Sequence, residues 1–112
     1  MTISYHGRVF RSVSGTGEVD ADTRFHYAQD GDLVFATYTG GAIRLGSLIA
    51  IADPGGNLEM RYQHLNRGGF LMTGVCRTRP ELLPDGRLRL HETWQWTSGD
   101  GAAGTSVLEE VR

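Results

Sequence analysis

The stretch Leu88-Arg-Leu-His-Glu-Thr-Trp-Gln-Trp-Thr97 alternates in polarity along its length. Its even-numbered positions are Leu88, Leu90, Glu92, Trp94 and Trp96, of which four are apolar, whereas no odd-numbered position is apolar. A period of two is typical of a β-strand with one dry face and one wet face. A helical count from Leu90 finds only one apolar residue in three positions. The pattern therefore predicts a strand that directs two tryptophans and one carboxylate to the same side of a sheet.

The rest of the chain is rich in turn signals. Glycine accounts for 16 of the 112 residues, about twice its usual share. Seven turn segments separate eight stretches, and they are Gly15–Gly17, Asp30–Asp32, Gly40–Gly41, Asp53–Asn57, Asn66–Gly69, Pro84–Gly86 and Ser98–Gly101. Asp30-Gly31 and Asp85-Gly86 are favourable hairpin dipeptides, because glycine accepts the positive φ that such turns require. No interval leaves room for a crossover helix, so we expect antiparallel pairing.

These features predict an all-β fold in one domain, residues 1–112. Eight antiparallel strands joined by sequential hairpins can close into an up-and-down β-barrel, and a two-sheet β-sandwich is the alternative. Ser106 and Glu109 could form a capping box that opens a short helix, but residues 105–112 are better explained as an eighth strand that pairs with the first. The G-x-G-x-x-G run at Gly99–Gly104 is interpreted as a hairpin, because the chain ends eight residues later.

Composition argues against several classes of function. A net charge of −2 and an isoelectric point near 6.0 give no basic footprint for nucleic acid or an anionic membrane. Only one cysteine, Cys76, is present, which fits a reducing compartment. The N-terminal residues do not resemble a secretory signal, and no apolar run approaches the roughly 18 residues of a membrane helix. We therefore expect a cytoplasmic protein without nucleic-acid or membrane partners.

Signals for catalysis and for metal binding are weak. The four histidines have no His-x-His or His-x₃-His spacing, so neither a metal site nor a cofactor is predicted. A Gly-x-Ser-x-Gly sequence does not occur. Cys76 lies within a predicted strand, where a cysteine is more often a small apolar residue than a nucleophile. The chain is therefore not expected to be an enzyme, although the residues leave that question open.

The best pointer to a site is Glu92, which shares a face with the two tryptophans. A carboxylate on an interior face must be paired, or its pKa must be raised. Arg8, Tyr38, Tyr62 and His64 are candidate partners, and Glu109 or Glu110 could join them. The predicted site residues are Arg8, Tyr38, Tyr62, His64, Glu92, Trp94 and Trp96. They could form a structural polar network, or a pocket in which aromatic side chains hold a ligand and polar groups orient it.

Several sequence runs resemble one family of small bacterial proteins of similar length. They are Phe25-His-Tyr27, Ala36-Thr-Tyr-Thr-Gly-Gly41, Arg61-Tyr62, Met72-Thr-Gly-Val-Cys76 and Leu90-His-Glu-Thr-Trp-Gln-Trp-Thr-Ser-Gly99. That family often carries the name N-acetylglutamate synthase, which implies acetyl transfer from acetyl-CoA. The phosphate-binding sequence of such enzymes is only approximated here, at Arg11–Gly17, with one residue too many. In architecture the expected barrel resembles lipocalin-like (calycin) proteins.

Three hypotheses of function follow. The first is a barrel that binds a small, partly apolar molecule in its interior. The second is a structural or interaction module, a homodimer formed through an apolar sheet face that includes Phe35 or Leu48. The third is the acetyltransferase activity that the family name implies. The aromatic and polar residues around Glu92 favour the first.

Overall fold

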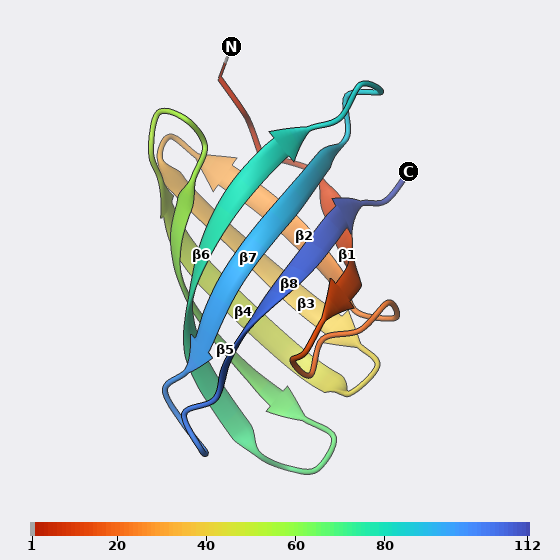
Figure 1. The fold of residues 1–112 in the computed structure, drawn as a ribbon, viewed down its shortest axis with the longest axis vertical. Coiled ribbons are helices and arrows are strands. Elements are labelled where there is room, and N and C mark those ends of the chain that lie inside the picture. The colour runs from red at the N-terminus through yellow and green to blue at the C-terminus, as the bar shows by residue number, and fades with distance from the viewer. Residues whose placement is uncertain (1) are drawn as a thin grey trace.

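Eight antiparallel strands close into a barrel in the computed structural model, which describes residues 2–112 (Figure 1). The strands are β1 (Val9–Gly15), β2 (Arg24–Asp30), β3 (Leu33–Gly40), β4 (Ile43–Ala52), β5 (Leu58–Asn66), β6 (Leu71–Leu82), β7 (Leu88–Trp96) and β8 (Ala103–Glu110). Each strand pairs with its neighbours in sequence, and β8 pairs with β1. The predicted up-and-down barrel is confirmed, and the alternative two-sheet sandwich is wrong.

The turns form where the glycine signals predict them. Gly31 and Gly86 adopt φ values of 61° and 89°, a region that favours glycine and that the two Asp-Gly turns require. The G-x-G-x-x-G run connects β7 to β8, whose pairing begins at Gln95 and Ala103. It is therefore a hairpin, as predicted. Residues 103–110 are a strand, so the capping-box alternative at Ser106 is wrong.

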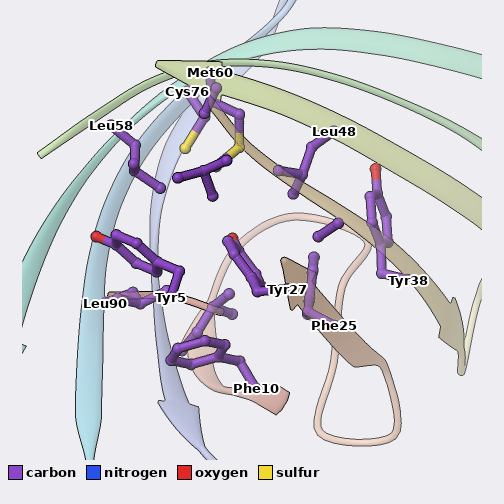
Figure 2. Packing of buried hydrophobic residues seen from close by; sticks show 14 of the residues in the cluster. Tyr5, Phe10, Phe25, Tyr27, Tyr38, Leu48, Leu58, Met60, Cys76 and Leu90 are labelled. Atoms are coloured by element: carbon purple, nitrogen blue, oxygen red, sulfur yellow. The ribbon is translucent and has the colours of Figure 1, made fainter. Parts of the chain in front are cut away.

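One end of the barrel is filled by large side chains. Phe10 and Tyr27 pack edge to face with ring centroids 5.0 Å apart, and Tyr5 lies against Tyr27 at 5.7 Å (Figure 2). The Tyr5 hydroxyl donates to the carbonyl oxygen of Gly56 at 2.6 Å, which fixes the N-terminal residues across this end of the barrel. Leu88 and Leu90 are fully buried beside them. The even face of the 88–97 stretch therefore points inward, as its alternation predicts.

Strand β4 is apolar on both faces, and its orientation could not be read from its composition. Leu48 is only 4% exposed and lies inside the barrel, whereas Ile49 and Ile51 point outward. A register irregularity between Ile43 and Leu45 places Ile43 inside and Leu45 outside, although both have odd numbers. The expectation that Leu48 could belong to an outer dimer face is therefore wrong.

Candidate functional site

A cavity of about 60 Å³ lies in the other half of the barrel. Six of the seven predicted site residues line it, and they are Tyr38, Tyr62, His64, Glu92, Trp94 and Trp96. They come from β3, β5 and β7, which curve around the same interior space (Figure 1). The parity of each strand, read from sequence, therefore brings together side chains that are far apart in the chain.

Arg8 is the exception, because it lies at the filled end of the barrel. Strand β1 begins at Val9, so Arg8 precedes the strand and the inward–outward alternation does not apply to it. Its guanidinium donates to the carbonyl oxygen of Gly86 at 3.2 Å and to Glu110 Oε1 at 2.6 Å. Glu109 pairs instead with Arg89, at 2.9 Å. The prediction that Arg8 belongs to the cavity is wrong, and neither Glu109 nor Glu110 lines it.

Aromatic rings form one side of the cavity. The Trp94 and Trp96 centroids are 5.6 Å apart with ring planes inclined at 59°, and Tyr62 meets Trp96 edge-on at 5.7 Å. Room for the Tyr62 ring depends on Gly74, directly opposite on β6, because a Cβ atom there would overlap the phenol. A glycine within a strand often marks such a close approach. The aromatic wall of Tyr62, Trp94 and Trp96 is thus shaped by a residue that has no side chain.

Glu92 lies on the cavity surface between two hydroxyl groups. Ser106 and Thr78, its cross-strand neighbours on β8 and β6, donate to its carboxylate at 3.1 Å and 3.4 Å. Burial raises the pKa of the Glu92 carboxyl to about 7, while the two hydroxyl donors act in the opposite direction. The group therefore changes its charge near neutral pH, which is unusual for a glutamate.

His64 connects two strands to the segment that covers the cavity. Its Nδ1 lies 2.9 Å from the Tyr38 hydroxyl, and its Nε2 lies 2.8 Å from Glu18 Oε1. A neutral imidazole protonated at Nε2 satisfies both contacts, because it accepts from the tyrosine and donates to the carboxylate. Asn66 donates to the other Glu18 oxygen at 2.9 Å. Both carboxylate oxygens of Glu18 therefore have partners on β5.

Residues 16–22, which lie in the connection between β1 and β2, form this covering segment. Gly17, Glu18 and Val19 line the cavity. Gly17 lies so close to Trp94 that an added Cβ would be 3.2 Å from the indole ring. The segment was not identified from sequence, because it is short and mostly polar and has neither a period of two nor a known motif. The proximity of Glu18 to His64 could be found only from the closed barrel.

The floor of the cavity is apolar and includes Phe25, Leu48, Met60 and Cys76. Burial raises the pKa of the Cys76 thiol far above its usual range, so the thiolate needed by a nucleophile is suppressed. The Tyr27 hydroxyl lies beneath this floor and points toward Met60 and Cys76 (Figure 2). It is the one buried side-chain polar atom without a hydrogen-bond partner in the part of the chain that the structure describes.

The described residues bring together no metal-ligand cluster. Nowhere in residues 2–112 do three or more histidine, cysteine, aspartate or glutamate side chains converge as metal ligands. The same residues include no helix that could cross a bilayer.

The cavity is small for a metabolite. Pockets for small molecules typically measure about 300–1,000 Å³, whereas the volume here is about 60 Å³, enough for a few water molecules. A larger ligand requires the covering segment to move, which breaks the contacts of Glu18 with His64 and Asn66. The cavity as it stands therefore holds at most a very small molecule.

Comparison with known proteins identifies the family of this chain. Curated proteins gave no match to the chain. Residues 3–111 match the family model described as "Avidin-like protein". The match extends over every strand of the barrel and includes all the residues of the cavity, from Gly17 to Ser106. The chain therefore belongs to the avidin-like protein family.

Proposed function

We propose that this barrel binds a small, partly apolar molecule in the cavity beside Trp94 and Trp96. The observation that carries the proposal is an interior cavity in which an aromatic wall faces a carboxylate, beside a core of buried hydrophobic side chains. Avidin-like barrels bind small ligands such as biotin. Membership of that family supports binding as a function and leaves the identity of the ligand to be found.

The aromatic and the polar residues of the cavity contribute differently to binding. The faces of Tyr62, Trp94 and Trp96 provide flat apolar area, and aromatic contacts of this kind supply much of the binding energy of small ligands. Glu92, with its two hydroxyl neighbours, offers a directional polar contact at the cavity surface. The covering segment opens to admit the ligand and then excludes water from it.

Tryptophan fluorescence tests the proposal directly, because both tryptophans of the chain line the cavity. We expect a saturable change when the protein is titrated with at least one member of a panel that contains biotin, fatty acids, amines and neutral heterocycles. Trp96→Phe should weaken that binding. Phe35→Ala, on the outer surface, should leave it unchanged. Absence of a saturable change, and of thermal stabilisation, across the whole panel would contradict the proposal.

An enzymatic interpretation is tested with the same protein. Incubation with acetyl-CoA and glutamate should give no acetylglutamate if the cavity only binds its ligand. Turnover that depends on Glu92 or His64 would favour the acetyltransferase hypothesis instead.

A second candidate function is self-association, which an outer apolar patch favours. Leu33, Phe35, Ile49 and Ile51 are 43–64% exposed and are cross-strand neighbours on β3 and β4. A contiguous exposed patch of this kind often marks an interface. The adjacent strand β5 carries the Glu59–Arg61 ion pair, and a border with both charge signs suits a two-fold interface, where each group meets its opposite. We propose a homodimer through this patch.

Sedimentation velocity at tens of micromolar tests the homodimer. The wild-type protein should sediment as a dimer, and Ile49→Lys should convert it to a monomer by placing a charge in the interface. Thr93→Lys, exposed on the outer face of β7, is the matched control and should remain a dimer. A wild-type protein that sediments as a clean monomer would refute self-association.

A further inference from the structure

We propose that the ligand of this cavity is a small organic cation, a protonated amine on an apolar body. The inference rests on the proposed function and adds the charge class of the ligand. Three lines of observation carry it: the charges that line the cavity, the state of their partners and the geometry of the aromatic wall.

The cavity has an acidic lining without a basic counterpart. Its ionisable residues include the carboxylates of Glu18 and Glu92 and the imidazole of His64, and none of its lining residues is a lysine or arginine. Arg8, the cation expected there, is bound to Glu110 at the far end of the barrel. An anionic ligand would therefore enter a site that repels it.

The two carboxylates differ in how well they are satisfied. Glu18 is used within the protein, because His64 and Asn66 occupy one oxygen each. Glu92 has only the hydroxyls of Thr78 and Ser106 as partners. Buried charges in proteins are normally paired with an opposite charge. Glu92 is therefore a partly buried carboxylate that lacks a counter-cation among the described residues, and it faces the cavity where a ligand would lie.

The aromatic wall is suited to a cation. Trp94 and Trp96 present two indole faces inclined at 59° with centroids 5.6 Å apart, and Tyr62 adds a third ring at 62° to Trp96. Rings set at such angles enclose a corner rather than a flat slot. Cations are attracted to indole and phenol faces, most strongly when they are removed from water. A carboxylate beside such a corner is a combination that recognises ammonium groups.

Three probes of matched shape test the charge class. They are benzylamine as the cation, benzyl alcohol as its neutral counterpart and benzoate as the anion, each titrated by calorimetry at pH 8. At that pH Glu92, with a pKa of about 7, is ionised and the amine is protonated. We expect benzylamine to bind roughly tenfold more tightly than benzyl alcohol, or better, and benzoate to show no binding.

Glu92→Gln separates the charge from the shape of the site. It should abolish the preference for benzylamine over benzyl alcohol, because the variant keeps the shape of the site and removes its negative charge. Glu59→Gln, on the outer surface beside Arg61 and Arg77, is the matched control and should keep the preference. Equal or tighter binding of benzyl alcohol or benzoate would overturn the inference, as would a preference that survives in Glu92→Gln.

Failure of this inference can be told from failure of the proposed function. If a neutral or anionic member of the fluorescence panel binds at the tryptophans and benzylamine does not, the inferred charge class of the ligand is wrong. The proposed binding function then stands. If neither the panel nor the three probes bind, both are wrong. Should Glu92→Gln fail to fold, the comparison of the three probes on the wild-type protein still decides the charge class.

Discussion

Replacing Glu92 with glutamine should change how the stability of the barrel depends on pH. In the folded protein the Glu92 carboxyl has a pKa of about 7, because burial disfavours its ionised form. Its ordinary value, 4.5, applies in the unfolded chain. Between these two values the folded protein holds a proton that the unfolded chain has lost. Stability due to this group is therefore complete below pH 4.5 and is lost as the pH rises through 7.

The size of the effect follows from the two pKa values. The interval from 4.5 to about 7, at about 1.4 kcal/mol per pH unit, corresponds to about 3 kcal/mol of unfolding free energy. Glutamine has the shape of the protonated acid, and like it can accept from one of the two hydroxyls, Thr78 or Ser106, and donate to the other, but it does not titrate. Relative to the wild type, the variant should therefore gain about 3 kcal/mol between pH 4.5 and pH 8.

Urea unfolding followed by tryptophan fluorescence measures this difference. Curves for the wild type and for Glu92→Gln are compared at pH 4.5, 6, 7 and 8, so that groups common to both proteins cancel. Glu59→Gln is a suitable control, because the pKa of that exposed carboxyl is lowered by its hydrogen bond to Arg61. Because the stability from a lowered pKa is present above the ordinary value of 4.5, the difference between this variant and the wild type should be nearly constant from pH 6 to pH 8. A Glu92→Gln difference that is constant from pH 4.5 to 8 would refute the assignment of Glu92 as a buried carboxyl with a raised pKa.

Other substitutions test the remaining features of the barrel. Glu18→Gln removes the charge that His64 contacts at 2.8 Å. We expect ligand association, measured by stopped-flow fluorescence, to become faster, with little change in melting temperature. An unchanged association rate would show that the covering segment does not control entry to the cavity. Gly74→Ala should displace the Tyr62 ring, which an added Cβ would overlap, and should cost about 1–3 kcal/mol of stability in urea unfolding; an unaltered near-ultraviolet circular dichroism spectrum would contradict this. Leu90→Ala empties a fully buried position in the filled half and should cost about 2–5 kcal/mol, whereas a loss below about 1 kcal/mol would mean that this half is loosely packed.

Much of the fold could be predicted because a strand with one dry face leaves a clear trace in the sequence. The even positions from Leu88 to Trp96 and the Asp-Gly turns were sufficient for antiparallel hairpins. The same method failed at β4, where Ile49 and Ile51 form the more apolar side and yet point outward. A hydrophobic pattern shows which side chains avoid water. It does not show whether they do so in the barrel interior or on the outer face of the sheet. An outer face that packs against another protein has the same pattern as an interior.

The site was predictable where it lies on strands and was missed where it lies on a connection. Alternation placed His64 and Glu92 on the inner face together with the tryptophans. Glu18 carries no such signal, because its position depends on the path of residues 16–22 across the closed barrel. Arg8 was misplaced for a related reason, since it precedes the strand whose periodicity was used to orient it. Side-chain direction follows from sequence only while the backbone remains regular.

The chain contains a single cysteine, and it lies on the floor of the cavity. Cys76 is therefore a built-in reporter of solvent entry, since a thiol reagent reaches it only after the barrel opens above it. The labelling rate under native conditions measures how often this occurs, on the free-energy scale that hydrogen exchange provides for backbone amides. A bound ligand should slow the labelling in proportion to its occupancy, without any need for the ligand to be coloured, fluorescent or known.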